Sequence, residues 1–256
     1  MSIHEKAGHT FLASLGKTRL RPGGTEATEW LFSQAQLTPE SRVLEVACNM
    51  ATTAIELVQR YGCHVTAVDM DKDALAKAKN NVAAQGLEDH IQVMPANANS
   101  LPFADNSFDV VINEAMLTMY ADKAKAKLLA EYYRVLKPGG RLLTHDIMFT
   151  AGRLAEEQQS QLQQVVKSNV SPMTKKGWRD ILLASGFAEV KQHQGQMSLM
   201  SPQGLIRDEG LKGAIRIVFN GLRYRENRSR FVGMFRFFRS QRRHLNYIAC
   251  CSVKGQ

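Results

Sequence analysis

No apolar run in this sequence reaches the roughly 18–20 residues that a membrane-spanning helix requires. The first twenty residues are polar, carry His4, Lys6, His9 and Lys17, and lack the apolar stretch and cleavage site of a secretory signal. These absences predict a soluble, cytoplasmic protein. Its 256 residues, 44% of them hydrophobic, are enough for one domain over 1–256 with a sizeable core.

Cysteine is scarce as well. The four cysteines are Cys48, Cys63, Cys250 and Cys251, and none forms a C-x-x-C pair. Neighbours such as Cys250 and Cys251 point to opposite faces of a strand, so they cannot chelate an ion together. We therefore expect free, buried thiols in a reducing compartment and predict no metal site.

What the chain does have is a regular alternation of short apolar runs and helical patterns. The runs 42–47, 64–68, 91–94, 108–113 and 141–146 read as buried strands, and helices are expected over 52–61, 72–85 and 121–136. This alternation predicts a parallel sheet with helices on both faces. Beyond it we expect a helix over 174–185, strands over 187–192 and 247–253, and a helical stretch over 203–243.

In an open parallel sheet, ligands bind beyond the carboxyl ends of the strands. Asp69 ends the second run, about 20 residues after the first turn, where a carboxylate accepts hydrogen bonds from ribose hydroxyls. It could instead cap the following helix. Asn97 follows the third run, and its amide matches the edge of an adenine, although a loop asparagine often bonds to its own backbone.

Four motifs in the right order give the chain a family resemblance. The runs 43–49 (VLEVACN), 65–69 (VTAVD), 100–111 (SLPFADNSFDVV) and 134–142 (RVLKPGGRL) resemble the class I S-adenosylmethionine-dependent methyltransferases. The likeness is to the small-molecule type, with a domain like that of the ubiquinone and menaquinone enzymes, and it covers about 40–150. It implies a Rossmann-like α/β fold with a seven-stranded, mostly parallel sheet. The last strand, 247–253, would be antiparallel and preceded by a helical insertion over 195–245.

The resemblance also implies a binding site for S-adenosylmethionine within a cofactor-binding core over 41–150. Glu45 would lie near the methionine amino group, Asp69 would hold the ribose and Met70 would flank the adenine. The remaining expected contacts are Ala47, Cys48 and Asn49 along the cofactor, Asn97 and Ala98 at the adenine, and Asn113 and Glu114 at the methionine end. Asn97 departs from the aspartate usual in the family, but it also accepts hydrogen bonds from an amino group.

The family's Gly-x-Gly-x-Gly turn is absent. Residues 47–51 read Ala-Cys-Asn-Met-Ala instead. Asparagine tolerates positive φ better than other non-glycine residues, so Asn49 can replace the middle glycine. An alanine forced into the left-handed region adds a strain of roughly 1–2 kcal/mol. We therefore expect weakened cofactor binding. No Gly-x-Gly-x-x-Gly follows the first strand, which argues against a nicotinamide-dependent dehydrogenase.

An N-terminal cap segment, 1–40, precedes this core. Its run Arg21-Pro22-Gly23-Gly24 is similar to one found in some related methyltransferases. We expect Arg21 and the backbone at Gly23 to bind the methionine carboxylate of the cofactor. The alternative is an ordinary turn before a helix that starts at Thr25.

Methyl transfer from a sulfonium is an in-line displacement, in which the enzyme mainly supplies alignment and desolvation. A general base is needed only when the acceptor is protonated. His145, at the end of the fifth strand, is the first candidate, although a histidine there is often structural. Glu114, Tyr120 and Asp146 are further candidates.

The net charge of +9 comes mostly from residues 207–244, which contain eleven basic and three acidic side chains. Leu211, Ile215, Val218 and Leu222 form one apolar stripe there, and Phe231, Met234, Phe235 and Phe238 form a core-facing second one. The arginines are interpreted first as a solvated face. The alternatives are contact with an acidic or phosphorylated small substrate, with nucleic acid or with a membrane surface.

Together these observations predict a methyltransferase that acts on a small molecule, with an acidic acceptor among the candidates. Substrate contacts are expected from the N-terminal segment and from 147–243, where apolar residues would line the acceptor pocket or simply pack the helices. One alternative is a cofactor-binding protein without transferase activity, which the altered turn suggests. Another is an RNA or protein methyltransferase. Residues 113–116 read Asn-Glu-Ala-Met in place of an Asn-Pro-Pro-Tyr-type signature, which argues against methylation of base amines.

Overall fold

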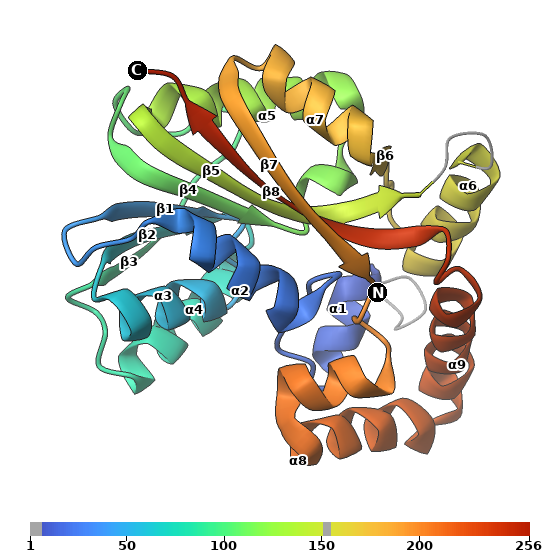
Figure 1. Ribbon diagram of the computed structural model, residues 1–256. Coiled ribbons are helices and arrows are strands. Elements are labelled where there is room, and N and C mark those ends of the chain that lie inside the picture. The colour runs from blue at the N-terminus through green and yellow to red at the C-terminus, as the bar shows by residue number, and fades with distance from the viewer. Residues whose placement is uncertain (1–6, 151–154) are drawn as a thin grey trace.

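The fold is a twisted sheet between two layers of helices, with a separate group of helices at one edge (Figure 1). A computed structural model describes residues 7–150 and 155–256. The strand order is β3-β2-β1-β4-β5-β8-β7, and a two-residue β6 pairs with β5. The bounds are β1 Arg42–Val46, β2 His64–Asp69, β3 Ile91–Pro95, β4 Phe108–Glu114, β5 Leu136–Phe149, β6 Met173–Thr174, β7 Phe187–Gln196 and β8 Leu245–Lys254.

The pairing confirms the class I methyltransferase fold expected from the sequence. Strands β1 to β5 are parallel, and β8 runs antiparallel between β5 and β7. The short β6 is the one addition to the seven expected strands. β5 also begins earlier than expected, at Leu136, because Gly139 adopts a φ of 76° and lets the chain bulge within the strand.

Each face of the sheet carries its own core. Helices α2 (Gly24–Ala35), α3 (Thr52–Tyr61) and α4 (Lys72–Ala84) cover one face. The other face is covered by α5 (Asp122–Val135) and α7 (Lys175–Ala184), with the 3-10 turn η1 (Leu117–Met119) nearby. All four cysteines are buried and free, as expected, and Cys250 and Cys251 belong to the two opposite cores.

A helical cap lies at the carboxyl edge of the parallel strands. It consists of α1 (Gly8–Ser14), α6 (Ala155–Val166), α8 (Pro202–Arg223) and α9 (Arg225–Ser240). Figure 1 shows α1 between the sheet and α8, and Phe11 and Leu12 of α1 share a buried cluster with Ile217 and Met234. The expected core-facing stripe of α9 is confirmed, because Phe231 and Met234 are buried while Phe235 and Phe238 pack against them.

The helical stretch expected over 203–243 is present but interrupted. The chain is non-helical at Gly210 (φ 69°) and again at Tyr224 between α8 and α9. The stripe formed by Leu211, Ile215, Val218 and Leu222 faces outward and is exposed. The packed side of α8 is formed instead by Leu205, Ala214, Ile217 and Gly221. Within residues 7–150 and 155–256, no helix is long and apolar enough to cross a membrane.

Two acidic residues of α8 hold the N-terminal segment in place. The fully buried Lys17 ammonium lies 3.3 Å from Asp208 and 3.5 Å from Glu209. Asp208 also accepts the backbone N–H of Thr25, and Glu209 accepts those of Thr18 and Arg19. These bonds join segments about 190 residues apart, so the cap depends on both ends of the chain.

We predict that Asp208→Asn lowers the free energy of unfolding by about 3 kcal/mol, because it removes the charge opposite a buried ammonium. Chemical denaturation measures this loss. Glu88→Gln, an exposed loop change of the same chemistry, serves as the control and should shift stability by less than about 0.5 kcal/mol. Equal small effects of both substitutions would show that the Lys17 pair contributes little.

Candidate functional site

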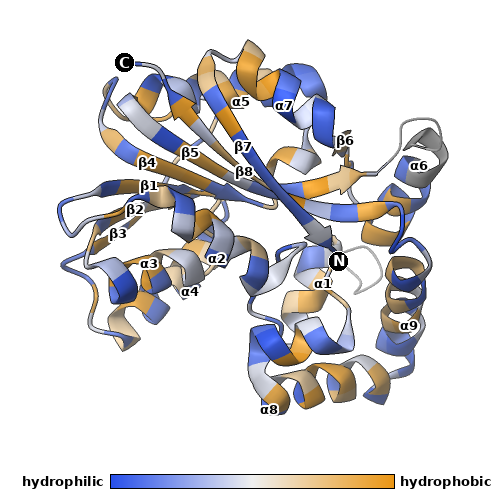
Figure 2. Cartoon of the chain, viewed as in Figure 1, coloured by the Kyte–Doolittle hydropathy of each residue, from blue (hydrophilic) through white to orange (hydrophobic). Residues whose placement is uncertain are grey.

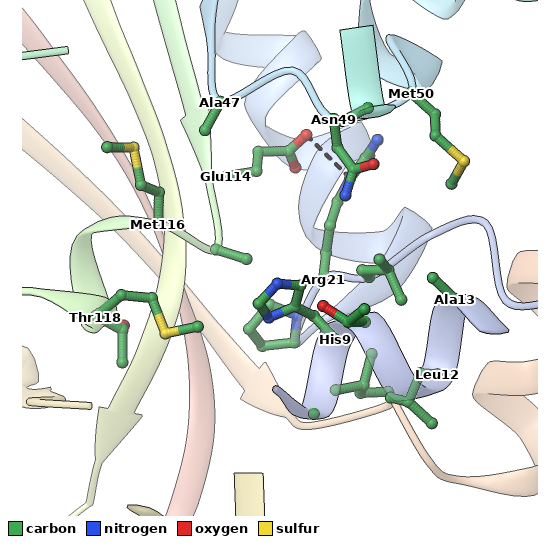
Figure 3. A pocket seen from close by; sticks show the side chains of 18 of the residues that line it. His9, Leu12, Ala13, Arg21, Ala47, Asn49, Met50, Glu114, Met116 and Thr118 are labelled. Carbon is green, nitrogen blue, oxygen red and sulfur yellow. Dashed lines mark ion pairs between the residues drawn. The ribbon is translucent and has the colours of Figure 1, made fainter. Parts of the chain in front are cut away.

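A cavity of about 830 Å³ opens where the carboxyl ends of β1, β2, β4 and β5 meet the helical cap. The sheet edge and its loops contribute mainly polar side chains, among them Glu45, Asp69 and Glu114. The cap and η1 contribute mainly apolar ones, among them Leu12, Ala13, Met119, Val166, Met234 and Phe238. Figure 3 shows this division around Arg21, with Ala47, Asn49 and Glu114 on one side and Leu12 and Ala13 on the other.

The turn after β1 adopts the backbone of a glycine-rich loop although it contains no glycine. Ala47, Asn49 and Ala51 have φ angles of 58°, 48° and 56°, all in the left-handed region. For the two alanines this conformation costs of order 1 kcal/mol each. A hydrogen bond holds the turn against β2, because the N–H of Cys48 donates to the carbonyl of Val68 (3.0 Å). The shape that close approach to a ligand requires is therefore preserved at a cost in strain.

Asp69 closes the turn from the neighbouring strand. Its Oδ2 accepts the N–H of Asn49 (2.9 Å) and its Oδ1 accepts the N–H of Asp71 (3.0 Å). Helix α4 is capped by Asp71 and not by Asp69, which leaves the second lone pair of each Asp69 oxygen for a ligand. Asp69 therefore both positions the turn and lines the cavity.

Glu45 lies in the floor of the cavity, 6% exposed. Its Oε2 accepts the N–H of Ala54 (3.0 Å) in the first turn of α3. Burial, together with the nearby charge of Glu114, raises the pKa of Glu45 to about 8, although Arg21 lowers it. A cation bound beside Glu45 would favour its ionised form.

Glu114 is the centre of a buried polar network. Its Oε2 lies 3.2 Å from Nε of Arg21, while Thr28 and Thr53 donate to its two oxygens at 2.8 and 2.9 Å. Burial alone would raise the pKa of Glu114, but the charge of Arg21 and the hydrogen bond from His145 lower it to about 2. Glu114 is therefore ionised at neutral pH.

His145 belongs to this network and does not line the cavity. Its Nε2 lies 2.9 Å from the N–H of Gly23 and accepts it, so the ring proton is on Nδ1 and is donated to Glu114 (3.1 Å). Burial lowers the pKa of His145, so the ring is neutral. With both nitrogens engaged, His145 cannot take a proton from a substrate, which argues against the hypothesis that it is the general base.

Arg21 lines the cavity, but most of its donors are already used. Nε faces Glu114, Nη1 donates to Thr28 and Nη2 donates to Thr52 and Thr53. Of the five guanidinium N–H groups, only one on Nη1 has no partner in the described part of the chain. Gly23 does not line the cavity, and its N–H is bonded to His145. We expected Arg21 and the backbone at Gly23 to bind a cofactor carboxylate. Of their N–H groups, that one on Nη1 of Arg21 is left to make such a contact.

Four other expected contacts lie outside the cavity lining. Asn97 accepts the backbone N–H of Asn99 with its own side chain, the local alternative weighed above. Ala98 is buried in the core, and Met70 is 69% exposed to solvent. Asn113 is fully buried and donates to the carbonyl of Val46 (3.0 Å). The expected residues that do line the cavity are Arg21, Glu45, Ala47, Cys48, Asn49, Asp69 and Glu114.

Asp146 lines the cavity, whereas its neighbour His145 does not. The side chain is 1% exposed, and Oδ1 accepts the N–H of Thr118 (2.8 Å). Among the described residues, none gives Oδ2 a hydrogen bond. Burial raises the pKa of Asp146 to about 7.

The sequence predicts substrate contacts from the N-terminal segment, but it reveals neither helix α1 within that segment nor the turn η1. His9, Leu12 and Ala13 of α1, and Thr118 and Met119 of η1, all line the cavity. A seven-residue helix and a three-residue turn carry too little periodicity for a pattern to reveal them. The basic segment contributes only Met234 and Phe238 to the lining, so no arginine from 207–244 faces the cavity.

Comparisons with known proteins agree with this architecture. Residues 43–140 match the model of a methyltransferase domain. An uncharacterized protein of Haemophilus influenzae is 50% identical over 98% of this chain and 99% of its own length. A ubiquinone/menaquinone biosynthesis C-methyltransferase of Brucella suis is 38% identical over 43% of this chain and 42% of its own length. The chain thus spans less than half of that named methyltransferase.

Among solved structures, phosphoethanolamine N-methyltransferase 2 of Haemonchus contortus in complex with S-adenosyl-L-methionine superimposes with a TM-score of 0.77. The match covers 97% of this chain and 57% of that one, at 19% identity. At this identity the likeness concerns the fold.

We predict that Ala47→Gly raises the free energy of unfolding by about 1 kcal/mol. The substitution relieves a left-handed alanine, and this relief exceeds the extra backbone entropy that glycine loses on folding. Ala76→Gly, on the exposed face of α4, is the control and should instead lose about 0.5–1 kcal/mol. Equal losses in both variants, measured by denaturant titration, would refute strain at Ala47.

Proposed function

Because this chain belongs to the S-adenosylmethionine-dependent methyltransferases, we propose that it methylates a small, largely apolar molecule held under the helical cap. The division of the cavity supports this proposal. Its sheet side is polar and anionic, and its cap side is lined by leucine, methionine and phenylalanine. A volume of about 830 Å³ lies within the range of roughly 300–1,000 Å³ typical of small-molecule sites.

The residues on the sheet side fit the cofactor. When bound, S-adenosylmethionine supplies a methyl group already activated by a sulfonium. Glu114 places negative charge at the end of β4, and Glu45 on β1 would ionise when a ligand's ammonium or sulfonium lies beside it, which matches the charges of the cofactor. Asp69 would accept hydrogen bonds from the ribose, as the sequence predicted, and the left-handed turn 47–51 lets the backbone approach the ligand.

On the cap side, the chain's own task is alignment and exclusion of water. Leu12, Met119 and Phe238 would orient an apolar acceptor. Lys77 and Arg21 are the basic side chains in the lining, and Arg21 is neutralised by Glu114. This environment favours an uncharged acceptor over the acidic one considered from the sequence.

Asp146 is our candidate for the general base if the acceptor is protonated. Its Oδ2 is free of partners among the described residues, it lines the cavity beside Tyr120, and its pKa near 7 suits proton transfer at neutral pH. The carboxylate would take the acceptor's proton, while Thr118 holds its other oxygen in place.

The proposal is tested by incubating the protein with methyl-labelled S-adenosylmethionine and cell extract separated into small-molecule and macromolecular fractions. We expect label in the organic-soluble small-molecule fraction. Met119→Trp, which fills the cap side, should lower this transfer by roughly tenfold or more without changing cofactor affinity. Leu183→Trp, on the exposed face of α7, is the control. Label confined to RNA or protein would overturn the proposal.

For Asp146 we expect kcat to rise with pH through about 7 and then level off, because only the ionised carboxylate accepts a proton. Asp146→Asn should remove this rise and lower kcat by about 10²–10⁴. Asp71→Asn, in the lining beside Asp69 and still able to cap α4, should keep the profile. A rise that persists in Asp146→Asn would assign the proton transfer to another group.

A further inference from the structure

Exposed apolar side chains gather on one helix of the cap. Nine large hydrophobic residues are exposed in the described part of the chain, and seven of them lie between 206 and 224. Five form a continuous stripe, which we call the outer α8 face: Leu211, Ile215, Val218, Phe219 and Leu222. Leu211 and Ile215 are 63% and 61% exposed, so this face is not covered by the rest of the described chain.

The opposite side of the same helix is fully packed. Ala214 and Ile217 are buried against α1 and α9, and Gly221 lies so close to Phe231 that a Cβ there would stand 2.7 Å from the ring. α8 is therefore apolar both toward the protein and toward the outside. Figure 2 shows the hydrophobic residues along α8 in orange. A helix that only has to cover a core carries polar residues on its outer side.

The outer α8 face is bordered by positive charge. Lys212, Arg216 and Arg223 flank the stripe on the helix, and Arg225 and Arg228 follow it; all five are exposed. The Arg223 guanidinium lies 5.6 Å from the centroid of the Phe219 ring, on the stripe itself. The acidic residues of α8 do not offset this charge at the surface, because Asp208 and Glu209 point inward to Lys17.

This combination selects among possible partners. Nucleic acid would match the arginines but leave the aliphatic side chains without a partner, since bases stack on aromatic rings. A second copy of the same face would bring the same positive border to the contact, where like charges repel. An anionic lipid surface matches both, because it accepts apolar side chains at the headgroup boundary and attracts arginine and lysine.

We propose that the outer α8 face binds the surface of an anionic membrane, with α8 lying in the plane of the headgroups. α1 packs directly behind α8, and its Leu12 and Ala13 line the cavity, so the bound state would hold the cap against the lipid. An apolar acceptor dissolved in that lipid would then lie close to the site. Only this last step rests on the proposed function; the binding itself does not.

The test is co-sedimentation of the full chain with vesicles of phosphatidylcholine alone or with about one third phosphatidylglycerol. We expect binding to the anionic vesicles only, falling as salt is raised. The paired substitution Ile215→Ser and Phe219→Ser should abolish it. Arg216→Gln with Arg223→Gln should weaken it roughly tenfold or more, since each charge contributes about fivefold. All four positions are exposed, and circular dichroism checks that the variants fold.

Two controls keep the proposal falsifiable. Leu183→Ser, an exposed apolar change on α7, and Lys176→Gln, an exposed charge change on the same helix, should leave vesicle binding unchanged. Equal binding to neutral vesicles, or no binding at all, would overturn the proposal. So would a wild-type dimer that the Ile215/Phe219 pair converts to a monomer, because the face would then join two copies. Failure of methyl transfer with intact vesicle binding would overturn only the proposed function.

Discussion

The candidate site depends on the ion pair between Arg21 and the ionised carboxylate of Glu114, together with the hydrogen bonds that surround it. An unpaired charge at this depth would be strongly unfavourable, so every group around it is arranged to stabilise it. Arg21 and Thr28 reach it from the N-terminal segment, Thr53 from α3 and His145 from β5. This side chain of β4 thus joins the segment before α2, two helices and β5. The same arrangement explains why His145 is neutral.

Glu45 and Asp146 differ from Glu114 in the direction of their pKa shifts, and this difference gives the two sides of the cavity different chemistry. Glu114 is compensated and stays charged, whereas burial raises the pKa of both Glu45 and Asp146. Glu45 lies on the side that suits a cationic cofactor, and Asp146 lies nearer to η1 and the apolar lining. Carboxylates of the same type therefore serve as a fixed charge, a responsive partner for a cation and a candidate proton acceptor, and their surroundings alone distinguish them.

The sheet could be predicted from the sequence because apolar runs, turn residues and the family motifs agree on it. Asp69 and the turn 47–51 were located for the same reason: strand ends fix where a loop lies. Sequence patterns do not predict whether a particular side chain at a strand end points into the cavity or into the core. His145 and Asp146 are adjacent, and only packing decides which one enters the cavity. Periodicity likewise groups Leu211 with Ile215 but does not say which way that face points.

The cap is built from both ends of the chain. Lys17 and Thr25 are held by Asp208, and β8, the last strand, is inserted between β5 and β7. On the ribosome, β1 to β5 emerge early enough to pair among themselves, but the Lys17 ammonium has no charged partner until Asp208 and Glu209 of α8 have been synthesised. Closing such a long loop is slow, and apolar surface stays exposed meanwhile. The binding cavity is therefore completed late in synthesis, and nascent chains that stall before α8 would expose the apolar side of α1 to chaperones and proteases.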